Sequence, residues 1–105
     1  MVIVETPIFT KRIQELISAE EYRIFQTHLV NRPDAGKIIS GSGGLRKLRW
    51  SASGHGKSGG IRVIYYWLIS KNVILLLYAY PKSEQGDLTT DQLRQLQRII
   101  EKEYL

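Results

Sequence analysis

The sequence predicts an α+β fold in which helices pack on an antiparallel sheet. Apolar residues recur at helical spacing near both ends of the chain, whereas residues 45–80 change to the two-residue period of β-strands. Within that segment, two strongly apolar runs are separated by only three residues, as in an antiparallel hairpin. The expected order is β-α-α-β-β-β-α. A run of strands flanked by helices is typical of α+β domains.

The first third of the chain is predicted to form a strand, Val2–Glu5, and a helical hairpin. Thr6 and Pro7 begin the first helix, because threonine caps free N–H groups and proline at the first helical position loses no hydrogen bond. Ser18 and Glu21 form a capping box that begins the second helix, which ends before Pro33. The buried faces of the two helices are expected to contain Phe9, Ile13, Leu16 and Ile17, and Tyr22, Phe25 and Leu29.

The remaining elements are three strands and a last helix. A glycine-rich loop over 36–44 precedes a strand over 45–50, and a second flexible segment over 51–60 precedes strands over 61–69 and 73–80. The last helix is expected over 87–104, with a capping box from Thr89 to Gln92. Asp87 is interpreted as charge at the start of this helix. We expect all helices on one face of the sheet and a basic opposite face.

Length and composition indicate one domain over residues 1–105, since 43% hydrophobic and 24% charged residues are ordinary for a globular protein. The absence of cysteine excludes disulfides and thiolate metal sites, and the spacing of His and acidic residues indicates neither a metal nor another cofactor. No signal peptide is recognisable, and Lys71 interrupts the apolar stretch over 61–80. We therefore expect a soluble cytoplasmic protein without a membrane partner.

The basic residues are concentrated in the middle of the chain. From Ala35 to Ser83 there are eight Lys and Arg residues and no acid, so the formal +5 divides into +8 there and −3 in the flanks. Such a one-sign field attracts polyanions, of which a nucleic-acid backbone is the most obvious. The alternative is a basic face that is merely solvated.

Strand pairing predicts where four of these cations meet. The start of one strand of a hairpin neighbours the end of the next, so Arg62 and Lys82 should lie close together. Lys47 and Arg49 share a face of the preceding strand. Guanidinium and ammonium groups can bind phosphate and stabilise the charge that develops during RNA cleavage without a metal. These residues indicate an anion-binding domain, with ribonuclease activity as one interpretation.

Three segments carry a resemblance to a known family. They are Gly-Leu-Arg-Lys-Leu-Arg at 44–49, Gly-Gly-Ile-Arg-Val-Ile-Tyr-Tyr at 59–66 and Leu-Tyr-Ala-Tyr-Pro-Lys-Ser-Glu at 77–84. With the last helix, they resemble the RelE superfamily of bacterial toxins, most closely its HigB-like branch. The resemblance implies a RelE-like, microbial-ribonuclease-like fold. It also implies a toxin that cleaves mRNA in the ribosomal A site, by metal-free attack of a 2′-hydroxyl on the scissile phosphate, and thereby inhibits translation.

The resemblance also implies partners and site residues. One partner is the ribosome with its mRNA and rRNA. The other is a HigA-like helix-turn-helix antitoxin, and the toxin would contact operator DNA only indirectly, through this antitoxin. The family's catalytic cations correspond to Lys47, Arg49, Arg62 and Lys82. Other basic residues are expected to bind RNA or the ribosome: Lys37, Arg46, His55, Lys57 and Lys71.

The chain departs from the family pattern at the general base. Ser83 stands where some relatives have arginine, and residues 85–92 contain no tyrosine. The base is left open among His55, Lys57, Lys82 and Tyr80. Two other functions are also left open: an RNA- or ribosome-binding inhibitor that does not cleave, and a DNA-binding module or inactive relative that acts only through its partner.

Overall fold

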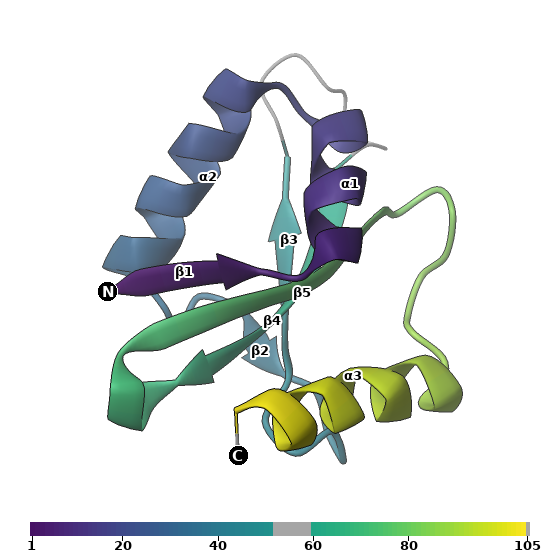
Figure 1. Cartoon of the computed structure of the whole chain (residues 1–105). Helices are drawn as coiled ribbons and strands as arrows, with labels where there is room; N and C mark the ends of the chain where they lie inside the picture. The colour runs from purple at the N-terminus through teal and green to yellow at the C-terminus, as the bar shows by residue number, and fades with distance from the viewer. Residues whose placement is uncertain (52–59, 105) are drawn as a thin grey trace.

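The computed structural model describes residues 1–51 and 60–104, and over these it confirms the α+β class (Figure 1). The predicted His55 and Lys57 lie outside the described residues. The elements are β1 (Val2–Glu5), α1 (Pro7–Leu16), α2 (Ala19–Asn31), β2 (Lys37–Ile38), β3 (Arg46–Trp50), β4 (Ile61–Leu68), β5 (Val73–Pro81) and α3 (Thr90–Glu103). A short 3-10 turn, Ile69–Lys71, joins β4 to β5.

The sheet is mixed rather than antiparallel, with the strand order β1-β5-β4-β3-β2. Strands β2 to β5 pair antiparallel, as predicted for the β4–β5 hairpin, but β1 pairs parallel to β5, with Val2 opposite Val73. The fully antiparallel prediction is wrong at β1 because no tight turn joins this strand to its neighbour. The strand β2 lies within the segment 36–44 that was expected to be a loop. It was missed because two residues are too few to show the alternating pattern of a strand.

Helices cover both faces of the sheet, so the prediction of one covered face is wrong. Helices α1 and α2 lie on one side and α3 on the other (Figure 1). The reason is that β4 and β5 are apolar on both faces, and each face needs a cover. Buried strand residues facing α1 and α2 include Leu48, Val63, Tyr65, Ile74 and Leu76. Those facing α3 include Ile64, Leu75 and Leu77.

The caps confirm the predicted starts of the first two helices. The Thr6 hydroxyl accepts a hydrogen bond from the Phe9 N–H at 3.1 Å, and the Ser18 hydroxyl accepts one from the Glu21 N–H at 3.1 Å. Both hydrogen bonds of the Thr89–Gln92 capping box are present. Because Thr89 is the cap itself, α3 begins at Thr90 rather than at the predicted Asp87.

A β-bulge between β4 and β5 decides which way the end of β5 faces. Ile64 pairs with Tyr78, whereas Tyr65 pairs with Leu76, so Leu77 is an extra residue in β5. One extra residue inverts the alternation of side chains beyond it. As a result Ala79 packs in the core beneath α1 and α2, while Tyr80 faces the α3 side together with its partner Arg62.

Tyr65 anchors the connection between α2 and β2 from inside the core. Its side chain is fully buried, its hydroxyl donates to the Pro33 carbonyl at 2.7 Å, and the same oxygen accepts from the Gly36 N–H at 2.8 Å. A Cβ atom at residue 36 would lie 2.7 Å from the Tyr65 ring, so only glycine fits against it.

Tyr65→Phe is therefore expected to lower the free energy of unfolding by about 1–3 kcal/mol, because it leaves a buried donor and acceptor without a partner. Urea denaturation followed by fluorescence would measure this. Tyr66→Phe is the matched control. Within residues 1–51 and 60–104 the Tyr66 hydroxyl has no hydrogen-bond partner, and the Tyr66 side chain is only half-buried. Equal stability losses for the two variants would contradict the anchoring role.

Candidate functional site

Three of the predicted cations meet on the α3 side of the sheet. Lys47 and Arg49 are two residues apart on β3, and Arg49 lies directly opposite Arg62 on β4. Residues directly opposite on neighbouring strands project from the same face, and like charges in that position repel each other. We call Lys47, Arg49 and Arg62 the basic cluster. Its arrangement favours an anion between the strands.

Arg62 is the least exposed member of the basic cluster, at 7%. Its Nη1 lies 3.4 Å from the Ile61 carbonyl oxygen, a long hydrogen bond within its own strand. A guanidinium stays protonated even when buried, so its desolvation has to be offset by nearby acceptors or by an anion. Arg62 thus has few acceptors of its own among the described residues, and an anion such as a phosphate would supply them.

Lys82 shares this end of the sheet through its backbone. Its N–H donates to the Gly60 carbonyl at 3.2 Å, which joins the residue after β5 to the residue before β4. Gly60 has a φ of +91°, and a Cβ there would lie 3.0 Å from the Trp50 carbonyl oxygen, so this junction needs glycine. The Lys82 side chain is exposed beside the start of β4.

Tyr80 has a structural role at the site instead of the open role of general base. Its side chain is fully buried, and its hydroxyl donates to the Gly86 carbonyl at 3.0 Å. Burial raises the pKa of the Tyr80 phenol, the nearby Asp87 carboxylate raises it further, and Arg62 opposes both. A buried phenol with a raised pKa does not accept a proton from substrate at neutral pH. Tyr80 instead holds the segment that follows β5 against the basic cluster.

Asp87 is a member of the site that the sequence interpretation missed. Its Oδ1 lies 2.6 Å from the Lys47 Nζ, although the two residues are 40 positions apart. The hydrogen bond from Lys47 holds the pKa of Asp87 below its usual value, and the charges of Lys47, Arg49 and Arg62 lower it further. Asp87 was interpreted as helix N-terminal charge, and nothing in the local sequence indicates its contact with β3.

The other predicted RNA-binding residues are dispersed. Lys37 on β2 lies opposite Lys47 and is exposed, so it extends the basic cluster toward the sheet edge. Arg46 projects to the other face, where its Nη1 donates to the Gly36 carbonyl at 2.8 Å and its guanidinium lies 5.8 Å from the Trp67 ring centre. Lys71 lies in the turn at the far end of the β4–β5 hairpin from Arg62. The structure therefore does not bring Arg46 and Lys71 to the cluster.

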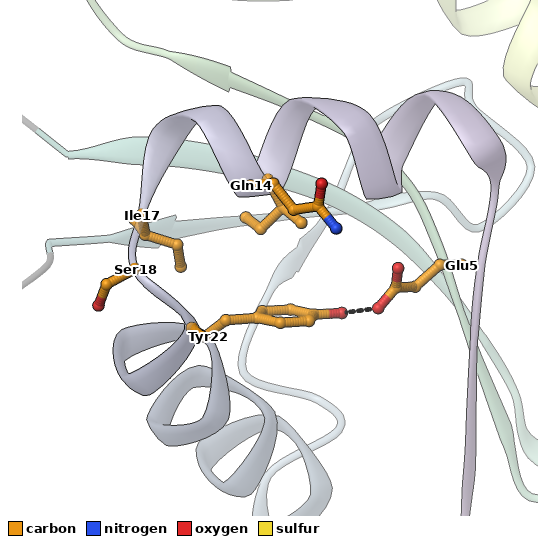
Figure 2. A pocket seen from close by; sticks show the side chains of 7 residues that line it. Glu5, Gln14, Ile17, Ser18 and Tyr22 are labelled. Atoms are coloured by element: carbon orange, nitrogen blue, oxygen red, sulfur yellow. Dashed lines mark hydrogen bonds between the residues drawn. The ribbon is translucent and has the colours of Figure 1, made fainter.

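A separate pocket of about 450 Å³ lies between α1 and α2 (Figure 2). Within it, the Glu5 carboxylate accepts hydrogen bonds from the hydroxyls of Tyr22 and Thr10, which connect β1 to both helices. Burial and the Glu5 charge raise the pKa of Tyr22. A pocket with a carboxylate repels phosphate, so it is not a second site for the same ligand. Its lining residues are Glu5, Ile13, Gln14, Ile17, Ser18, Ala19 and Tyr22.

Within residues 1–51 and 60–104, no group of three or more His, Cys, Asp or Glu side chains could hold a metal ion. In the same residues, no helix has both the length and the apolar character needed to cross a membrane.

The chain is similar to known toxins in both sequence and fold. A family model described as the RelE toxin of the RelE/RelB toxin–antitoxin system matches residues 19–105. A mutant of the Escherichia coli RelE toxin in the free state has a TM-score of 0.61 at 16% identity, over 99% of this chain and 97% of that one. The isolated E. coli RelE toxin gives 0.58 at 16% identity, over 93% and 97%. The intact E. coli RelBE toxin–antitoxin complex gives 0.57 at 18% identity, over 74% of this chain and 92% of that one.

The structural likenesses show that the mixed sheet and three helices are shared with RelE. The family match covers α2, every strand of the sheet except β1, and α3, and it includes the whole basic cluster. On this match, the chain belongs to the RelE family of toxins of toxin–antitoxin systems.

Proposed function

We propose that this toxin is a ribosome-dependent endonuclease that cleaves mRNA in the A site and thereby inhibits translation. The observation that carries the proposal is the basic cluster, in which Arg49 and Arg62 are directly opposed and Lys47 lies on the same face. Their mutual repulsion is relieved when a phosphate lies between them. Membership of the RelE family supports this reaction class, since RelE toxins generally are translation-inhibiting endoribonucleases.

The proposed reaction is transfer of the phosphodiester within the RNA. The 2′-hydroxyl loses its proton and its oxygen bonds to the adjacent phosphorus, while the bond from phosphorus to the 5′-oxygen breaks and that oxygen takes up a proton. The products are a 2′,3′-cyclic phosphate and a 5′-hydroxyl. Arg49 and Arg62 are placed to stabilise the extra negative charge on the phosphorane. The ribosome would supply orientation of the substrate, which explains how so sparse a site can be sufficient.

We propose a smaller set of candidates for the group that accepts the 2′-hydroxyl proton. Tyr80 is buried and has a raised pKa, so we remove it from the set. His55, Lys57 and Lys82 stay as candidates, of which only Lys82 lies within the described residues.

We also propose a cognate antitoxin as the partner, because the similar E. coli RelE is found in a complex with RelB. A helix-turn-helix, HigA-like antitoxin, membership of the HigB-like branch and a cytoplasmic location stay predictions. Operator DNA would be bound only through the antitoxin.

Primer extension on a defined mRNA, with and without programmed ribosomes, tests the function. Cuts within the A-site codon that need ribosomes are the expected result. Intact mRNA on stalled ribosomes that have bound the protein would instead establish the non-cleaving inhibitor. Cleavage of free RNA would contradict ribosome dependence, and absence of any inhibition by the isolated protein would favour an inactive relative.

A further inference from the structure

Asp87 places a carboxylate where the basic cluster would bind phosphate. Its Oδ1 contacts the Lys47 Nζ at 2.6 Å, and Arg49 and Arg62 act on the same carboxylate. The Asp87 side chain is 82% exposed, whereas Lys47 is only 27% exposed. The carboxylate is thus far more accessible to solvent than the lysine with which it pairs.

The segment that carries Asp87 is held in place by its own hydrogen bonds. The Tyr80 hydroxyl donates to the Gly86 carbonyl at 3.0 Å, immediately before Asp87. The Gln85 Nε2 donates to the Asp87 carbonyl at 2.9 Å and to the Gln92 Oε1 at 3.0 Å, which connects the segment to the first turn of α3. The backbone of Asp87 is therefore positioned by contacts other than its ion pair with Lys47.

We propose that Asp87 is an internal competitor of RNA: its carboxylate occupies the phosphate position on Lys47, and a bound RNA strand displaces it. The inference rests on the proposed function, because it takes the basic cluster as the RNA site. An exposed ion pair is weak, so an RNA held in place by the ribosome displaces it readily. A free RNA strand lacks that help and meets both the occupied lysine and the repulsion of the carboxylate. Asp87 thereby lowers the affinity of the toxin for RNA outside the ribosome.

Binding of a 2′-O-methyl RNA oligonucleotide, followed by fluorescence anisotropy, tests this without any cleavage. Asp87→Asn and Asp87→Ala are expected to tighten binding by about three- to tenfold at low salt. The slope of log affinity against log salt is expected to steepen by about 0.7, the value for one more phosphate contact on a single strand. The difference in RNA affinity between the Asp87 variants and the wild-type protein should disappear near 1 M salt, where the Debye length is about 3 Å.

Asp91→Asn is the matched control. Asp91 lies four positions further on, its side chain is 87% exposed, and its partner is Arg94 within α3, at 4.0 Å. The substitution changes the net charge by the same amount without touching the basic cluster. Thermal unfolding of all variants would show that each is folded. Asp87→Ala is included because the side-chain amide of Asp87→Asn could still accept a hydrogen bond from Lys47, whereas alanine cannot.

The outcomes separate this inference from the proposed function. Equal affinities for the Asp87 and Asp91 variants, or weaker binding by the Asp87 variants, would overturn the inference even if the wild-type protein cuts A-site mRNA. Tighter binding by the Asp87 variants alone would support the inference, even if primer extension finds no cleavage and the endonuclease proposal fails.

Discussion

Arg62→Ala is expected to lower the rate of A-site cleavage by about two to three orders of magnitude, the usual effect of losing one group that stabilises a developing oxyanion. Arg62 is 7% exposed and directly opposite Arg49, so its loss removes one of the two paired guanidinium groups of the basic cluster. Single-turnover cleavage of mRNA on programmed ribosomes measures the effect. In cells, the same change should relieve growth arrest.

Control variants distinguish a loss of catalytic activity in Arg62→Ala from a failure of the variant to fold. Arg62→Lys keeps the charge but not the planar fork of donors, and we expect an intermediate rate. Lys82→Ala should also relieve growth arrest, and Arg98→Ala, an exposed arginine on α3, should leave the rate unchanged. Circular dichroism and thermal unfolding would establish that the variants are folded. Full toxicity of folded Arg62→Ala and Lys82→Ala proteins would remove both residues from the site.

Phe25→Ala is expected to have the largest effect on stability, about 3–5 kcal/mol. Phe25 is fully buried on α2, and its ring packs edge-on against Trp50 of β3 at 5.3 Å and stacks with Tyr22 at 6.2 Å. Removing it leaves a cavity between α2 and the sheet. Since domains of this size are stable by only about 5–15 kcal/mol, much of the margin would be lost.

Ile24→Ala is the matched control for this prediction. Ile24 precedes Phe25 on the same helix but is 50% exposed, so a loss of well under 1 kcal/mol is expected. Urea denaturation of both variants gives the comparison. Similar losses for the two positions would mean that α2 does not pack on the sheet through the Phe25 face.

Local elements were predictable because their signals lie within a few residues. The caps at Thr6, Ser18 and Thr89 use side chains that reach N–H groups three positions away. The β4–β5 hairpin follows from two apolar runs joined by a short turn. Predicted strand pairing also placed Arg49 and Arg62 in one region, since consecutive antiparallel strands are neighbours.

Long-range features of the site were not predictable in the same way. The bulge at Leu77 turns Tyr80 toward Arg62, and no turn residue or glycine marks it in the sequence. The contact between Asp87 and Lys47 joins residues 40 positions apart and depends on where the segment after β5 lies. Arg46 points to the opposite face of β3 from Lys47 and Arg49. Which of these two faces is packed against helices is decided by the burial of the apolar residues of β3.

By itself, the sequence determined most of the secondary structure, although not the short β2 or the start of α3. It also determined the concentration of positive charge in the middle of the chain and the resemblance to RelE toxins. These depend on spacing, capping and composition, which act over short stretches of chain. The tertiary structure alone decided the parallel direction of β1, the covering of both sheet faces and the placing of Asp87 on the basic cluster. Each of these depends on how apolar faces are buried together, and burial is a property of the whole fold.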